Sequence, residues 1–119
     1  MIRFINCVKR RPDITVEQFR QFWNSAEFDK LIKQVVAASG AKRYRKSATL
    51  IVEANALVQQ RRGSSEPFDG VLEYWWDNAS HLTDLFGESH MSELTDKMLD
   101  YQKQFIDMAH TSAFFTEAE

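Results

Sequence analysis

The chain has 119 residues, of which 44% are hydrophobic, and a formal net charge of −2 at neutral pH. This length suits a single domain, residues 1–119, with a sizeable core. Acidic and basic residues nearly balance and form no long basic block, which excludes a protein that binds nucleic acid through a basic tract.

Cys7 is the only cysteine, so the chain cannot form an internal disulfide or a thiolate metal cluster. The N-terminus lacks the apolar segment of a signal peptide, and no apolar run approaches the ~18 residues of a membrane span. We therefore predict a soluble, cytoplasmic protein without a membrane partner.

The first third of the chain predicts a strand followed by a helix. Residues 1–9 are rich in β-branched and aromatic types, and Pro12 ends this strand. Thr15 and Gln18 have the spacing of a capping box, in which each side chain satisfies a free backbone N–H of the other. Apolar residues then recur at helical spacing as far as Gly40, so one helix is predicted over 15–40.

The middle of the chain predicts two strands and a loop. Residues 41–53 alternate between polar and apolar side chains, which is typical of a strand with one wetter face. Residues 54–68 end in Arg-Arg-Gly-Ser-Ser-Glu-Pro and are predicted to form a loop. Residues 69–77 follow as an aromatic strand.

The aromatic strand is apolar on both faces. Period-two geometry places Val71, Glu73 and Trp75 on one face. The residues between them, Leu72, Tyr74 and Trp76, then occupy the other face. Helices from so short a chain can cover only one side of a sheet. We therefore expect a second copy to cover the other side, giving a homodimer with this strand in the interface.

The last third predicts two helices and a closing strand. A short helix ends at Gly87, a second helix repeats apolar residues from Met91 to Met108, and residues 111–116 form a strand. The predicted order is β-α-β-β-α-α-β. This order fits an α+β, ferredoxin-like split βαβ fold, in which helices cover one face of an antiparallel four-stranded sheet.

Several segments resemble the EthD family of the dimeric α/β barrel superfamily. The segment 9–23 resembles the opening of the family, and 42–44, 69–77, 105–107 and 111–117 resemble later parts in the same order. The resemblance implies that two ferredoxin-like units pair their sheets into a barrel, with a pocket between sheet and helices in each subunit. Relatives include cofactor-free oxygenases and cyclases of aromatic polyketides, and a protein associated with degradation of an alkyl ether.

Two histidines that are frequent in the family are missing. One would lie on the first helix, where this chain has Glu27 or, with a shift of one residue, Phe28. The other would lie after Tyr44, near Ala48. The histidines that are present, His81, His90 and His110, are not spaced as metal ligands. We therefore predict no metal, haem, flavin or other cofactor.

Glu27 is the candidate catalytic base. In a continuous helix it would share a face with Trp23 and Leu31, and burial beside them would raise its pKa towards neutrality. The alternative is a surface residue that pairs with Lys30 or Lys33.

Five further residues are candidates for substrate binding. Asn6 and Tyr44 offer polar anchors, and Trp23 and Trp75 offer aromatic walls. Glu73 is the fifth, although a salt bridge to an arginine such as Arg43 or Arg45, or a contact across the dimer, would also explain it. Asn6 could equally bond a neighbouring side chain, and each tryptophan could belong to the core.

The resemblance to the EthD family implies an enzyme of the cofactor-independent oxidoreductase type, and we expect these residues to serve it on a small hydrophobic and possibly aromatic molecule. A base removes a proton from an acidic carbon, and the carbanion then reacts with oxygen. Two alternatives stay open: a non-catalytic binding or accessory homodimer, and a cyclase or lyase that uses the same pocket.

Overall fold

A computed structural model describes residues 1–80 and 82–117 of the chain, so His81 lies outside the described residues. The helices and strands follow the order β1 (Ile2–Val8), α1 (Val16–Trp23), α2 (Ala26–Ser39), β2 (Arg43–Ala48), α3 (Glu53–Arg62), β3 (Gly70–Trp76), α4 (Leu82–Gly87), α5 (Ser89–Gln102), a 3-10 turn η1 (Met108–His110) and β4 (Ser112–Glu117). No helix in the described ranges has the length and apolar character needed to cross a bilayer.

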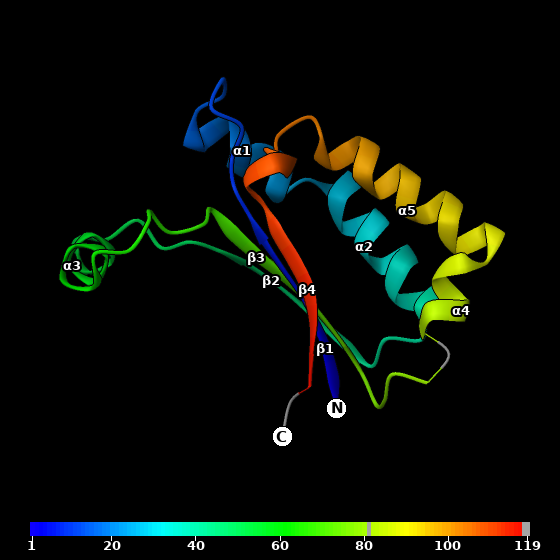
Figure 1. Ribbon diagram of the computed structural model, residues 1–119. Coiled ribbons are helices and arrows are strands. Elements are labelled where there is room, and N and C mark those ends of the chain that lie inside the picture. Colours follow the sequence, from blue (N-terminus) through cyan, green and yellow to red (C-terminus); the bar gives the residue numbers. More distant parts are fainter. Residues whose placement is uncertain (81, 118–119) are drawn as a thin grey trace.

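The strands form one antiparallel sheet in the order β2-β3-β1-β4. Helices α1, α2, α4 and α5 all lie on the same side of this sheet (Figure 1). We call that side the covered face and the other side the open face. The predicted ferredoxin-like fold is therefore confirmed.

The predicted single helix over 15–40 is wrong, because the chain forms two helices. The capping box at Thr15 and Gln18 is present, but α1 ends at Trp23. Ser25 then caps α2 by accepting a hydrogen bond from the backbone N–H of Phe28, at 3.1 Å. Because the helix axis changes at this cap, residues before and after it do not share one helical face.

The predicted loop over 54–68 is also partly wrong, because it contains α3. Glu53 to Arg62 are mostly good helix formers, and Gly63 ends the helix in the left-handed conformation with φ of 62°. Strand β2 is correspondingly shorter than the predicted 41–53. In Figure 1, α3 lies beyond the ends of β2 and β3, away from the other helices.

The core lies between the covered face and the helices, and it is largely aromatic. Phe19, Phe28 and Phe105 are at most 1% exposed, and Phe105 stacks on Phe22 with ring centroids 5.2 Å apart. Trp23 packs directly on the backbone at Gly70, where an added Cβ would come within 2.8 Å of the indole ring. This close approach is the reason that β3 begins with glycine.

Candidate functional site

A cavity of about 990 Å³ lies between the covered face and the helices α4 and α5. Strands β1, β3 and β4 supply its floor, and α2, α4 and α5 supply its walls. Most of its lining is apolar or aromatic, and it includes Ile2, Phe4, Leu72, Tyr74, Trp76, Leu82, Phe86, Met98, Leu99, Met108 and Phe115. Its volume lies within the range of pockets that hold small organic ligands.

The aromatic floor follows from strand register. Phe4 lies opposite Tyr74 on β3 and opposite Phe115 on β4, so these three rings share the covered face. The ring of Phe4 is 5.1 Å from that of Phe115 and 6.1 Å from that of Tyr74, measured between centroids. Trp76 and Phe86 extend the group, each within 6.4 Å of Phe115. Such walls suit a flat apolar molecule.

Two carboxamides interrupt this apolar lining. Asn6 of β1 is 6% exposed, and its Oδ1 has no hydrogen-bond partner among the described residues. Gln102, the last residue of α5, also lines the cavity and is 4% exposed. An unpartnered buried polar atom costs about 1–3 kcal/mol, and Oδ1 is closed off from the cavity, so turning the Asn6 carboxamide to bring Oδ1 into the cavity would recover a hydrogen bond.

The nearby Thr111 differs from Asn6 because its hydroxyl is already engaged. Its Oγ1 accepts from the backbone N–H of Lys9 at 3.1 Å and donates to the carbonyl of Asp107 at 2.8 Å. Thr111 therefore fixes the chain at the start of β4, whereas Oδ1 of Asn6 has no partner among the described residues.

Charge is scarce in the cavity. Of the described residues that line it, only Tyr74 and Glu117 have ionisable side chains, and Glu117 is exposed at its rim. Burial, with a smaller contribution from nearby Tyr44, raises the pKa of Tyr74 well above its ordinary value. Tyr74 therefore stays a neutral hydroxyl, and the site can orient a ligand through neutral hydrogen bonds but offers no buried base.

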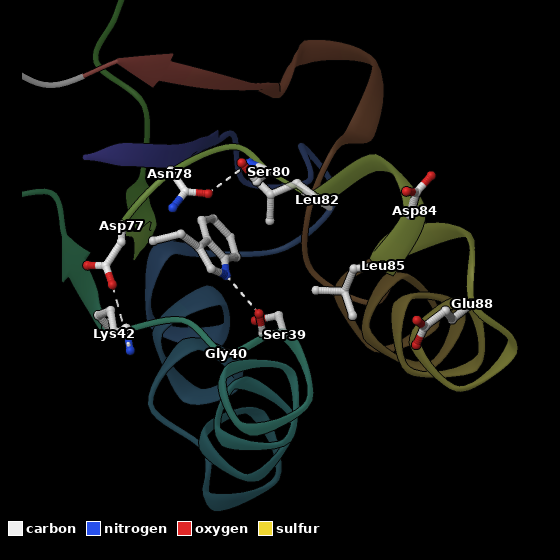
Figure 2. Close-up of a pocket in the computed structure, with 11 residues that line it drawn as sticks. Ser39, Gly40, Lys42, Asp77, Asn78, Ser80, Leu82, Asp84, Leu85 and Glu88 are labelled. Atoms are coloured by element: carbon white, nitrogen blue, oxygen red, sulfur yellow. Dashed lines mark hydrogen bonds and ion pairs between the residues drawn. The ribbon is translucent and has the colours of Figure 1, made fainter.

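A second, smaller hollow of about 430 Å³ shares Trp76 and Leu82 with the large cavity. Figure 2 shows two interacting pairs among its polar groups: Lys42 approaches Asp77 at 3.8 Å, and Asn78 accepts from the backbone N–H of Ser80 at 2.9 Å. The indole N–H of Trp76 donates to the carbonyl of Ser39 at 3.0 Å. These contacts fix the Trp76 ring as a wall of the larger cavity.

The predicted place of Glu27 is wrong. Because the helix breaks at Ser25, Glu27 falls in the first turn of α2 and is exposed, whereas its neighbour Phe28 is fully buried. Glu27 does not line the described cavity. The interpretation of Glu27 as a surface residue fits this position.

Glu73 and Trp75 occupy the open face, so the prediction that they line the pocket is wrong. Arg3 pairs with the Glu73 carboxylate at 3.2 Å, and the Arg43 guanidinium lies 4.1 Å from the Trp75 ring centroid. With these contacts Trp75 is only 5% exposed within its own chain. The open face is therefore less apolar than the alternation of β3 predicted.

The other predicted site residues divide between cavity, core and edge. Asn6 lines the cavity, and its role as a polar anchor for a substrate stays a prediction. Trp23 is a core residue, 1% exposed and stacked on Phe19. Tyr44 lies on the edge strand β2, 39% exposed and outside the described cavity. Gln102 and Trp76 are lining residues that sequence reasoning missed, although Trp76 belongs to the predicted second face of β3.

The part of the chain that the structure describes contains no group of three or more His, Cys, Asp or Glu placed to hold a metal ion. The prediction that the protein has no cofactor stays a prediction.

Comparison with solved structures supports the fold. A dimeric ferredoxin-like protein of unknown function from Bacteroides fragilis aligns with a TM-score of 0.62 and 13% identity, over 98% of this chain and 95% of that one. The structure of a variant of SnoaB, a cofactor-independent oxygenase from Streptomyces nogalater, aligns with a TM-score of 0.58 and 8% identity. This alignment covers 99% of this chain and 92% of that one. An ethyl tert-butyl ether d (EthD) family protein from Bacillus halodurans aligns with a TM-score of 0.60 and 11% identity, over 100% of this chain and 99% of that one.

No curated protein matches the chain. The profile of the EthD domain matches residues 11–109, which include all the helices and the strands β2 and β3. The chain belongs to the EthD family.

Proposed function

We propose that the protein binds a small hydrophobic, ring-containing molecule in the cavity between the covered face and α4–α5. The observation that carries this proposal is a cavity with aromatic walls whose lining includes Asn6, a buried carboxamide with an unpartnered Oδ1. The walls contribute apolar burial, and the carboxamide fixes the orientation of one polar group on the ligand.

We further propose that the bound molecule is oxidised by dioxygen without a cofactor. Membership of the EthD family and the likeness to SnoaB, described as a cofactor-independent oxygenase, support this reaction type. Because the described lining residues include no buried base, the carbon-bound proton passes to water. The carbanion gives its electron pair to dioxygen and a C–O bond forms, and the resulting peroxide anion takes a proton from water. Loss of the second C–H proton then breaks the O–O bond, which releases water and leaves a ketone in place of the CH₂ group.

The cavity would assist this reaction by holding the carbanion. Negative charge that is delocalised onto a substrate oxygen is stabilised by a hydrogen bond from the Tyr74 hydroxyl, while Asn6 Oδ1 accepts a hydrogen bond from another polar group of the substrate. The raised pKa of Tyr74 suits a donor that stays protonated.

The second candidate function is non-catalytic binding of the same class of molecule. The exposed position of Glu27 and the lack of a buried carboxylate or imidazole among the described lining residues favour it. Both functions share the cavity, so they differ only in turnover.

The binding experiment compares 1-naphthol with naphthalene on the wild type and on Asn6→Leu. Calorimetry should show that this substitution weakens 1-naphthol binding at least tenfold and changes naphthalene binding less than twofold. Because it removes an unpartnered polar atom from an apolar site, the variant should be at least as stable as the wild type. Equal loss of both ligands, or no binding of either by the wild type, would contradict the proposal.

Oxygen uptake with anthrone, an aromatic ketone with an acidic CH₂ group, separates the two functions. An enzyme should raise the rate above that of the uncatalysed reaction, and Asn6→Leu should reduce the increase. Binding without extra uptake would favour the non-catalytic function.

A visible absorption spectrum of the purified protein tests the predicted lack of haem and flavin.

We also propose that the protein is a homodimer. Similar structures from Bacteroides fragilis and from Thermobifida fusca, the latter with 14% identity and a TM-score of 0.58 over 98% of this chain and 90% of that one, are described as dimeric. Sedimentation equilibrium at micromolar concentration tests it, and a single monomeric species would contradict it.

A further inference from the structure

Strand register divides the floor of the cavity into three rows, each of which crosses β1, β3 and β4. The first row holds Asn6, Leu72 and Ala113, the second holds Phe4, Tyr74 and Phe115, and the third holds Ile2, Trp76 and Glu117. Successive rows are two residues apart along each strand, so the three rows extend over about 13 Å. The cavity is therefore long enough to treat the two ends of a ligand differently.

The C-terminal end of α5 lies at the first row. In Figure 1, α5 begins beside α4 and ends near α1. Just beyond the helix, the backbone N–H of Asp107 donates to the carbonyl of Lys9 at 2.8 Å, which holds this end of α5 beside the segment that follows β1. Gln102, the last residue of α5, is therefore at the same end of the cavity as Asn6.

Both carboxamides at this end have unused hydrogen-bonding groups. No hydrogen bond among the described residues involves the side chain of Gln102, and its polar atoms are not sealed off as Oδ1 of Asn6 is. The amide nitrogen of Asn6 also has no partner there. A ligand that fills this end displaces water from these groups, so it must replace their hydrogen bonds or lose affinity.

The first row also lacks a charge that could compensate a charged ligand. The described lining residues include no Lys, Arg or His, and their one carboxylate, Glu117, is in the third row. The C-terminal end of α5 adds partial negative charge near the first row. A carboxylate there would be desolvated and unpaired, and an ammonium would find no carboxylate in that row. An uncharged polar group meets neither cost.

The other end of the cavity offers aromatic contacts instead. Trp76 of the third row and Phe86 of α4 have ring centroids 6.3 Å apart and meet nearly at right angles. An apolar ring gains most by lying against such surfaces. The polar group of a ligand that binds in this way points to the first row.

We infer that Gln102 is a specificity-determining residue: together with Asn6 it selects a ligand whose polar end is uncharged and both donates and accepts hydrogen bonds. A carboxamide or a hydroxyl group has this character, whereas a carboxylate does not. The inference rests on the proposed binding function and names the chemical class of the ligand's polar end.

The wild type tests the ligand class directly. 2-Naphthamide and 2-naphthoate have the same ring and nearly the same shape, but only the amide is uncharged at neutral pH. Calorimetry should show that the amide binds at least tenfold more tightly than either 2-naphthoate or naphthalene. Equal affinities for the amide and the carboxylate would overturn the inference.

Gln102→Met tests the residue, because methionine has nearly the same length and no amide group. It should weaken 2-naphthamide binding at least fivefold and change naphthalene binding less than twofold. Gln104→Met is the matched control, since Gln104 is exposed and does not line the described cavity. It should change the binding of both ligands less than twofold. Gln102→Leu repeats the test with a branched side chain, so that a packing defect in one variant is recognised.

The outcomes separate this inference from the proposed function. A wild type that binds none of the three ligands would overturn both. A wild type that binds all three with similar affinity would overturn the inference alone. The same holds if both Gln102 variants lose 2-naphthamide and naphthalene equally, or if neither loses 2-naphthamide.

Discussion

The two faces of the sheet carry neighbouring residues of the same strands and yet have opposite character. On β3, Leu72, Tyr74 and Trp76 face the helices and line the cavity. Their neighbours Glu73 and Trp75 face the other way, where arginines contact both. Aromatic content therefore does not identify which face of the sheet holds the cavity. The covering helices do, because they enclose the cavity on one side only.

The two faces also bury aromatic rings in different ways. Trp76 is packed among other apolar groups, and its indole N–H donates one hydrogen bond to the carbonyl of Ser39. Trp75 is buried beneath guanidinium groups, through cation–π contacts that keep the arginine charge at the surface. Only the first kind of burial leaves a neutral cavity for an apolar ligand.

The largest effect on the free energy of unfolding is expected at β3, where two adjacent residues can be compared. Leu72→Ala should lower the free energy of unfolding by about 2–5 kcal/mol, because Leu72 is 1% exposed and packed against the helices. Val71→Ala, on the open face, should cost less than about 1 kcal/mol. Urea midpoints at constant m-value measure both changes. Equal losses would mean that the open face is buried as deeply as the covered face.

A smaller effect is expected where the covered face meets α1. Gly70→Ala should destabilise the protein by about 1–3 kcal/mol, since the new Cβ would lie 2.8 Å from the Trp23 ring and force it to move. Gly87→Ala is the control, because its Cβ would meet nothing within 4 Å. Thermal unfolding of both variants checks the difference, and equal midpoints would show that Trp23 has room to shift.

The covered face should also give stability a dependence on alkaline pH. In the unfolded chain Tyr74 ionises above about pH 10, whereas burial keeps the folded residue neutral, so the native state then binds more protons. Stability should therefore fall as pH rises above 10, by at most ~1.4 kcal/mol per pH unit. Tyr74→Phe should reduce this slope in urea titrations between pH 9 and 11, and the part that persists is assigned to Cys7, whose pKa is also raised by burial. Tyr44→Phe should reduce it only slightly, and an unchanged slope in Tyr74→Phe would contradict the assignment.

The smallest effect is expected at Glu27. Its exposed position on α2 predicts that Glu27→Gln changes stability by less than ~0.5 kcal/mol. Oxygen uptake with anthrone, if the protein catalyses it, should persist in this variant. A loss of turnover with unchanged stability would indicate that Glu27 takes part in catalysis.

Local signals predicted most of the fold because each depends on residues close in sequence. The capping box at Thr15, the terminating Gly40 and the alternation of β3 are all present as predicted. The break at Ser25 was missed because apolar residues on both sides keep a helical spacing. A serine that caps a new helix looks, in sequence, like one exposed residue within a longer helix. Helix α3 was missed because it has no buried side from which its periodicity could be recognised.

The sequence by itself determined the order of the four strands and which residues of each strand share a face, since both follow from short-range geometry. Tertiary structure alone decided which face the helices cover, and hence that Asn6 lies in the cavity while Glu73 and Trp75 do not. It also decided that Glu27 is exposed, because the direction of α2 depends on how it packs against α5 and the sheet. Alternation in the sequence divides the residues of a strand between two faces but does not say which face the helices cover. Only long-range packing decides that.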